Sequence, residues 1–214
     1  MAGFTAAPFR NIAARLGASF TVTELVSARG IRHDPDLHRS ERYLHPTTGD
    51  KPWGIQLFGF DAEDFAFAID RLLSDPRYRD VSFIDLNMGC PAPKITGNNA
   101  GSSLLRDPDL AVSIAKAVVE AVSRPVTVKM RTGWDPDHLV CVDLAKRLED
   151  AGVAALTVHG RTKDQMYAPP VDRSSIKAVV DAVSIPVIAN GDVRDGPSAK
   201  SMLEETGAAA VMVG

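Results

Sequence analysis

The stretch "DLNMGCPAPK" (85–94) ends an apolar run on Cys90, which lies between a glycine and a proline. An unperturbed thiol has a pKa of about 8.5, so near neutral pH it is mostly protonated and can act as a general acid. A packing role is the alternative, since many buried cysteines are inert. A zinc site is disfavoured because no second cysteine or histidine lies at ligand spacing. A nucleophile would need a lowered pKa and a nearby base, which the sequence does not indicate.

Other polar side chains lie at or just beyond the ends of apolar runs. Lys129 lies between Val128 and Met130 in one such run, so its ammonium group needs a partner inside the protein. Gln56 could bind a ligand or be satisfied by the backbone, and His159 could be functional or a core residue. The residues in such positions are Gln56, Asn87, Cys90, Lys129, Arg131, His159, Arg161, Asn190 and Asp192. The second cysteine, Cys141 in "DHLVCVDLAKRL", lies in a helical pattern that predicts packing.

Short apolar runs that favour strands alternate with amphipathic segments along the chain. The runs are nearly continuous in apolar residues, which is typical of parallel strands covered on both faces. The predicted strands are 20–25, 53–59, 83–88, 126–131, 155–160, 186–191 and 209–214. The predicted helices are 9–17, 62–73, 107–122, 137–152, 174–183 and 196–207. This alternation predicts an α/β fold with a parallel sheet.

The strand count favours a (β/α)8 TIM barrel, because "MAGFTAAPFR" resembles the exit of a further strand that ends at about Met1. Such barrels typically have about 250 residues and place the active site at the carboxyl ends of the strands. We therefore expect one domain, 1–214, that is incomplete at both ends, with the body of strand one and the final helix absent. A doubly wound sheet is disfavoured, since neither G-x-G-x-x-G nor a Walker lysine motif is present.

Composition narrows the class of protein further. Apolar residues make up 45% of the chain and the net charge is −3, which predicts a globular protein whose nucleic-acid binding would need a local basic face. Two cysteines do not suggest a disulfide framework, so a reducing cytoplasm is expected. No apolar run is long enough to span a bilayer, and no metal site or protein partner is indicated.

The motifs resemble those of the tRNA-dihydrouridine synthases, in order and spacing. They are "MAGFTAAPFR", "IQLFG", "DLNMGCPAPKITGNNAGSSLLRDP", "VTVKMRTGW", "LTVHGRTKDQMY" and "PVIANGDV". The resemblance implies an FMN-dependent barrel that reduces particular uridines in tRNA, with NADPH as the electron donor (EC 1.3.1.-). It also implies a C-terminal helical domain, absent here, that grips the tRNA. The chain departs from the family pattern at Thr5-Ala6, where Thr-Asp is usual, and at Gly214, where a Gly-Arg pair is cut.

The resemblance also gives roles to the polar residues at the strand ends. Cys90 would donate a proton to C5 of uracil while reduced FMN supplies a hydride to C6. Asn190, Gly191 and Asp192 suit the phosphate and ribityl groups, and Asp192 is expected either to cap the next helix or to hold a ribityl hydroxyl. The residues implied to bind FMN are Met1, Gln56, Lys129, His159, Asn190, Gly191, Asp192 and Gly214. Those implied to bind the substrate are Asn87, Lys94, Arg131 and Arg161.

Loops at the same face are expected to shape the entrance to the site. Polar loops are predicted at 45–52 and 95–103, and four loop cations could form a rim that binds phosphates or is merely solvated. These cations are Lys94, Arg131, Arg161 and Lys163. Two other functions stay open. One is an FMN barrel that acts on a free pyrimidine, like dihydroorotate or dihydropyrimidine dehydrogenase, and the other is a non-catalytic fragment.

Overall fold

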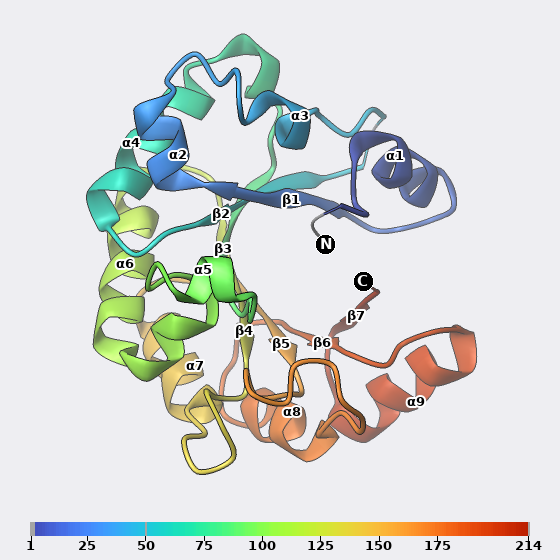
Figure 1. Cartoon of the computed structure of the whole chain (residues 1–214). Helices are drawn as coiled ribbons and strands as arrows, with labels where there is room; N and C mark the ends of the chain where they lie inside the picture. The colour runs from blue at the N-terminus through green and yellow to red at the C-terminus, as the bar shows by residue number, and fades with distance from the viewer. Residues whose placement is uncertain (1–2, 50, 214) are drawn as a thin grey trace.

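The computed structural model describes residues 3–49 and 51–213, in which strands and helices alternate (Figure 1). The strands are β1 (Thr21–Ser27), β2 (Trp53–Phe58), β3 (Phe83–Met88), β4 (Val126–Arg131), β5 (Ala155–His159), β6 (Val187–Asn190) and β7 (Ala210–Met212). The helices are α1 (Ala7–Arg15), α2 (Ala28–His33), α3 (Glu41–Leu44), α4 (Ala62–Leu73), α5 (Pro93–Thr96), α6 (Pro108–Ala121), α7 (Cys141–Asp150), α8 (Arg173–Val180) and α9 (Gly196–Thr206). Two 3₁₀ helices, η1 (Pro76–Tyr78) and η2 (Gly101–Arg106), complete the described elements. The predicted strands and longer helices are confirmed, with ends that differ by a few residues.

The described strands form one parallel sheet in the order β1 to β7. Helices α2, α4, α6, α7, α8 and α9 follow one another around its outside, each packed against the next (Figure 1). The sheet curls around its inner face like part of a barrel wall, and β1 and β7 at its two edges are not paired with each other in the described ranges. This is an α/β fold of the TIM-barrel-like kind. In the ranges that the structure describes, none of the helices is long and apolar enough to cross a membrane.

Short sequence signals set where the longer helices begin. The side chains of Asp61, Asp107 and Asp195 accept a backbone N–H at the start of α4, α6 and α9 respectively. A proline follows the aspartate within the first turn of α6 and of α9, where its missing N–H costs nothing. Gly207 ends α9 in the left-handed conformation, with φ of 71°.

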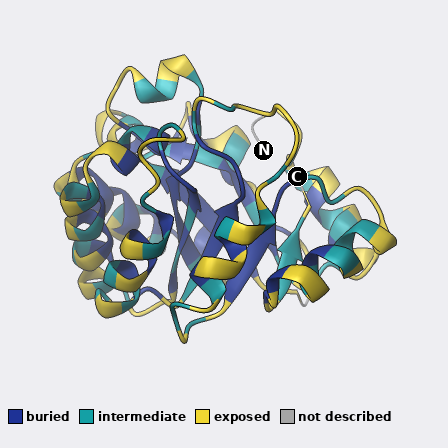
Figure 2. Ribbon diagram, turned by 90° about the horizontal axis from the view of Figure 1, so that it is seen from below, coloured by how far each residue is buried: buried dark blue, intermediate teal, exposed yellow. Residues whose placement is uncertain are grey.

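The two faces of the sheet have opposite chemistry. The outer face is apolar and packs on the helices, with Ile55, Leu57, Ile84, Leu86, Val126, Val128, Met130, Leu156 and Val158 in the core. The inner face carries the alternate residues of the same strands, which are mostly polar. Figure 2 shows the sheet as largely buried and the outward surfaces of the helices as exposed. The predicted cover on both faces is confirmed, since nearly every residue of β2, β3 and β6 is buried, but the inner rows carry more polar side chains than nearly continuous apolar runs predict.

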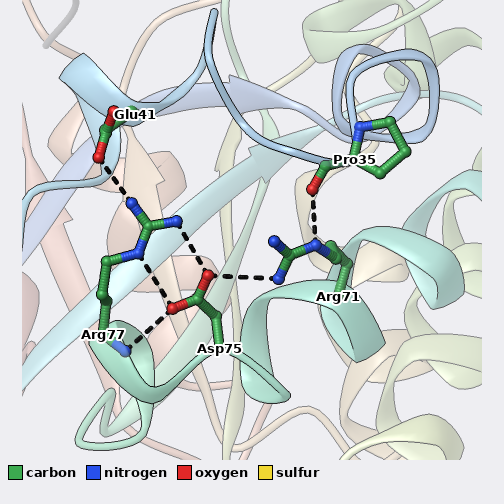
Figure 3. Close-up of polar contacts among 5 residues, drawn as sticks. All are labelled: Pro35, Glu41, Arg71, Asp75 and Arg77. Atoms are coloured by element: carbon green, nitrogen blue, oxygen red, sulfur yellow. Dashed lines mark hydrogen bonds and ion pairs between the residues drawn. The ribbon is translucent and has the colours of Figure 1, made fainter.

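A cluster of charged groups ties the segment between β1 and β2 to the end of α4 (Figure 3). Arg77 donates to both oxygens of Asp75, at 3.0 and 2.9 Å, and to Glu41 at 2.6 Å. Arg71 donates to Asp75 at 3.3 Å and to the carbonyl of Pro35 at 2.6 Å. These hydrogen bonds, chiefly those of Arg77, hold the pKa of Asp75 far below its usual range. Because the cluster precedes β3, it belongs to the edge where strands begin, away from Cys90.

Candidate active site

The loop that carries Cys90 is hydrogen-bonded on both sides. The side-chain Oδ1 of Asn87 accepts the N–H groups of Gly89 and Cys90, at 3.2 and 2.9 Å. The carbonyl of Cys90 accepts from the N–H and the hydroxyl of Ser102, at 3.1 and 2.9 Å. The Arg131 Nε donates to the carbonyl of Gly89 at 2.9 Å. Every polar backbone group of Gly89 and Cys90 thus has a partner, so the half-buried thiol of Cys90 projects from a fixed backbone.

The segment 95–103 is a polar loop only in part, since residues 97–99 form an exposed turn between two short helices. Its first residues complete α5 and its last residues begin η2, where Ser102 is completely buried. Gly101 has φ of 61°, and a Cβ at this position would lie 2.8 Å from the carbonyl oxygen of Cys90. The glycine therefore lets η2 come close enough to hold the Cys90 loop. Polar composition misled the prediction, because Ser102 uses its polarity inside the protein.

A chain of buried hydrogen bonds extends from this loop across the inner face. The Nδ2 of Asn87 donates to Oε1 of Gln56 at 2.9 Å, and Nε2 of Gln56 donates to Oδ2 of Asp85 at 2.6 Å. The Thr127 hydroxyl donates to Oδ1 of Asp85 at 2.5 Å. Burial raises the pKa of Asp85 to about 6, against the effect of these hydrogen bonds and of the Lys129 charge. The sequence analysis missed Asp85, although a carboxylate two residues before Asn87 in an apolar strand must share its face.

Lys129 has the internal partner that its position predicts. Its Nζ donates to Oδ1 of Asn190 at 2.9 Å, and Nδ2 of Asn190 donates to the carbonyl of Met212 at 3.0 Å. Burial lowers the pKa of Lys129 to about 8, and the charge of Arg131 acts in the same direction. The groups of Asp85 and Cys90 are close enough to oppose this shift. At neutral pH Lys129 is therefore a cation in a poorly hydrated place, where it interacts strongly with any anion.

His159 is a neutral hydrogen-bonding group. Burial and three neighbouring cations lower its pKa to about 2. The NH1 group of Arg161 lies 3.1 Å from Nε2 of His159. Because a guanidinium group only donates, Nε2 must accept and the ring proton must lie on Nδ1. His159 thus offers an N–H donor rather than a positive charge.

Arg131 and Arg161 are not the loop cations that we predicted. They are 2% and 3% exposed. Arg131 donates to the carbonyls of Thr162 and Met166 at 2.8 and 2.7 Å. Arg161 donates to the carbonyl of Ala168 at 2.8 Å. Both side chains therefore fasten the segment after β5 to the inner face, and the predicted rim of four cations is wrong in these two members.

The two lysines of that rim do lie on the surface. Lys94 is exposed on α5. The Nζ of Lys163 lies 4.4 Å from the ring centre of Trp134, and Arg106 lies 4.9 Å from the same ring. Lys163 also pairs with Asp164 at 3.0 Å, so Lys94 is the member of the predicted rim that is exposed and has no ion pair among the described residues.

The turn after β6 places Asp192 against Arg161. Both carboxylate oxygens of Asp192 accept from NH2 of Arg161 at 2.8 Å, which lowers the pKa of the carboxyl group. Asp192 does not cap the next helix, since Asp195 forms the capping box of α9 with Ser198. That part of the prediction is wrong. Asp192 instead balances the charge of a buried arginine.

Gly191 allows a close approach that no other residue would permit. It has φ of 115°, and a Cβ would lie 2.6 Å from a Val171 methyl group and 2.9 Å from the ring of His159. The missing side chain therefore lets Val171 and the ring of His159 pack directly against the turn after β6. Met1 and Gly214, which were also predicted to bind the cofactor, lie outside the described residues.

The strand register gathers these groups on adjacent rows of the inner face. Gln56, Asp85 and Thr127 are paired across β2, β3 and β4. Asn87 pairs with Lys129 in the next row. The row at the strand ends joins Arg131, His159, Asn190 and Met212. The result is a protein of the TIM-barrel-like class with a thiol, a desolvated ammonium group and a neutral imidazole at the carboxyl ends of its strands.

The comparisons with known proteins identify the family. The family model described as dihydrouridine synthase matches residues 1–214, and the chain belongs to this family. A probable tRNA-dihydrouridine synthase of Rhodobacter capsulatus is 44% identical over 214 residues. The tRNA-dihydrouridine synthase B of Pectobacterium carotovorum is 43% identical over 217 residues. Both alignments cover 100% of this chain, which spans 64% and 65% of the length of these relatives.

Solved structures support the fold alone. The Amycolatopsis orientalis BexX/CysO complex matches with a TM-score of 0.59 and 18% identity, over 99% of this chain and 76% of the other. Nitroalkane oxidase from Streptomyces ansochromogenes matches with a TM-score of 0.54 and 18% identity, over 99% of this chain and 62% of the other.

Proposed function

We propose that the protein reduces particular uridines in tRNA to 5,6-dihydrouridine, with FMN as its cofactor and NADPH as the reductant. Family membership and relatives named tRNA-dihydrouridine synthase support the reaction and the substrate. The observation that carries the proposal is the Cys90 thiol on a fully hydrogen-bonded loop, near the charges of Lys129 and Arg131. A flavin enzyme that adds a proton to a pyrimidine needs a positioned acid of this kind.

The donors on the inner face fit a flavin. The electron-rich pyrimidine edge of FMN needs a cation and N–H donors, which Lys129, Gln56 and the Nδ1 of His159 can supply. Asn190 and Gly191 lie at the carboxyl end of β6, where side-chain amide and backbone N–H groups suit a phosphate or ribityl group. The residues proposed to hold FMN are Met1, Gln56, Lys129, His159, Asn190, Gly191, Asp192 and Gly214. When bound, FMN supplies the hydride that goes to C6 of uracil.

In this proposal the chain's own residues hold the substrate and supply the proton. Cys90 donates its proton to C5, and Lys129 stabilises negative charge beside the pyrimidine edge. Asn87 orients the Cys90 loop and directs its remaining amide N–H at the uracil. Lys94 contacts a phosphate, whereas Arg131 and Arg161 act on the substrate by holding the segment after β5. The target base has to leave its stack to reach this face, so binding involves base flipping.

The proposal extends to the whole fold and to the place of action. We propose that a strand joins the edges of β1 and β7, which closes the sheet into a (β/α)8 barrel. Each of these two strands has one partner among the described residues. The protein would act in the cytoplasm, with tRNA and NADPH as its partners.

Reductase assays on different substrates test this function. Protein incubated with FMN should oxidise NADPH when unmodified tRNA is added, and dihydrouridine should form in that tRNA. Turnover with free uracil or orotate and none with tRNA would favour a free-pyrimidine dehydrogenase instead. Protein that stays colourless after incubation with FMN, with no turnover, would indicate a non-catalytic chain.

A further inference from the structure

Both ends of the buried chain between the Cys90 loop and Asp85 have a fixed hydrogen-bonding sense. At one end, the backbone N–H groups of Gly89 and Cys90 can only donate. At the other end, Asp85 is 3% exposed and accepts from both sides. Its pKa of about 6 leaves it ionised at pH 7, where a carboxylate can only accept.

Fixed ends leave one orientation for the two amides between them. If Asn87 were flipped, its Nδ2 would face two backbone N–H groups, and donors would meet donors. With Asn87 in place, Gln56 must turn Oε1 toward it and Nε2 toward Asp85. Position 85 must therefore supply an acceptor. Without an acceptor there, a buried amide N–H of Gln56 would lose its partner. The whole series of hydrogen bonds from Gln56 to the Cys90 loop would then be destabilised.

We propose that Asp85 is a positioning residue for Cys90. Its carboxylate fixes the orientation of Gln56, which fixes Asn87, and Asn87 holds the two N–H groups that set the direction of the thiol. The inner-face register supports this chain, since Asp85 is paired with Gln56 on one side and with Thr127 on the other. Any effect on catalysis rests on the proposed function, whereas the positioning itself does not.

Three substitutions test whether the hydrogen-bond acceptor at position 85, rather than its negative charge, positions the Cys90 loop. Asp85→Leu keeps the branching at Cγ and removes the acceptor. Asp85→Asn removes the charge but keeps an acceptor for Gln56, because its Nδ2 can turn to the Thr127 hydroxyl, which also accepts. Thr127→Val is the matched control, since it removes the other hydrogen bond to the same carboxylate and leaves the chain to Cys90 intact.

Amide hydrogen exchange of Gly89 and Cys90, followed by NMR, reports on the loop without cofactor or substrate. We expect Asp85→Leu to speed exchange at both amides by about tenfold, the worth of one net hydrogen bond. Asp85→Asn and Thr127→Val should stay within about threefold of the wild type. Backbone amides of Leu144 and Leu148, in the core of α7, should be unchanged in all three variants and so report that each one is folded.

A second substitution keeps the test decisive if Asp85→Leu does not fold. Gln56→Met removes the middle link and should speed exchange at the same two amides. In a folded double variant the two effects should not add, because they break one chain. Unchanged exchange at Gly89 and Cys90 in folded Asp85→Leu or Gln56→Met protein would overturn the proposal. So would an Asp85→Asn variant that loses as much protection as Asp85→Leu.

The same variants distinguish this proposal from the proposed function. If the protein reduces uridine, Asp85→Leu should slow that step by about tenfold and Asp85→Asn should restore it. Altered exchange without any uridine reduction would support the positioning role and refute the activity. Normal exchange in an Asp85→Leu variant that still reduces uridine would support the activity and refute the positioning role.

Discussion

Cys90 and Cys141 carry the same thiol group but differ in their position in the fold, their burial and their neighbours. Cys90 follows β3 on a loop whose backbone groups are all hydrogen-bonded, and its thiol is half-buried near Lys129 and Arg131. Cys141 is the first residue of α7, is 3% exposed and belongs to the apolar core. Burial raises the pKa of Cys141, which makes its thiolate still scarcer. The surroundings, not the residue type, decide which thiol can do chemistry.

The rates at which the two thiols are alkylated test the difference between Cys90 and Cys141 most directly. In native protein without cofactor, iodoacetamide should alkylate Cys90 at least about 10³ times faster than Cys141, because Cys141 reacts only after the core opens. Mass spectrometry of peptides at successive times gives both rates. Similar rates for the two thiols, or faster labelling of Cys141, would contradict the packing that separates them.

Ionisation of the buried Asp85 should make the free energy of unfolding depend on pH. The folded pKa of Asp85, about 6, lies above its unfolded value, so its stabilising contribution is complete below pH 3.8 and is lost as the pH rises through 6. Between pH 7 and pH 4 the wild type should gain about 2 kcal/mol relative to Asp85→Asn. Urea unfolding of both proteins at each pH measures this difference, and parallel curves would refute the burial of an ionised Asp85.

His159 should have the opposite signature. Its folded pKa, about 2, lies below the unfolded value, so its contribution is complete above pH 6.5 and is lost as the pH falls. At pH 5 the wild type should have lost about 2 kcal/mol relative to His159→Gln, compared with neutral pH. An imidazole NMR titration with a midpoint near 6.5 would show instead that His159 is protonated freely.

Serine substitutions at Cys90 and Cys141 should change the free energy of unfolding by different, smaller amounts. Cys141→Ser puts a hydroxyl group into the apolar core and should lower the free energy of unfolding by about 1–2 kcal/mol. Cys90→Ser, at a half-buried position with polar neighbours, should change it by less than about 0.5 kcal/mol. Urea unfolding of both variants at pH 7 gives the values, and an equal loss in the two would remove this distinction.

The sequence predicts the scaffold much better than the contacts on it. The ranges of β3 and β4 are predicted residue for residue, because each is an apolar run that favours strands. The predicted helices 9–17, 137–152 and 196–207 also end correctly, since Gly17, Gly152 and Gly207 all have the positive φ that is typical just beyond a helix. Such features depend on a few neighbouring residues, so a local pattern carries them.

The partners of polar side chains depend on segments far apart in the chain. Arg131 is buried because carbonyls of Thr162 and Met166 come to meet it, and nothing near position 131 signals this. The Ser102 hydroxyl likewise donates to the carbonyl of Cys90, and no residue near position 102 signals this contact. Asp85 was within reach of prediction, since its spacing from Asn87 puts both on one face. A polar residue inside an apolar strand predicts an internal partner, but only the fold says which one.

The central claim is that Cys90 is the proton donor, and half-reaction kinetics of Cys90→Ala test it. Protein loaded with FMN is first mixed with NADPH to follow flavin reduction, and the reduced protein is then mixed with unmodified tRNA to follow reoxidation. We predict flavin binding and reduction like those of the wild type, and reduction of uridine that is slower by about 10²–10⁴-fold, the usual worth of a general acid. Cys90→Ala protein that fails to bind FMN, or that reduces uridine at the wild-type rate, would contradict the account.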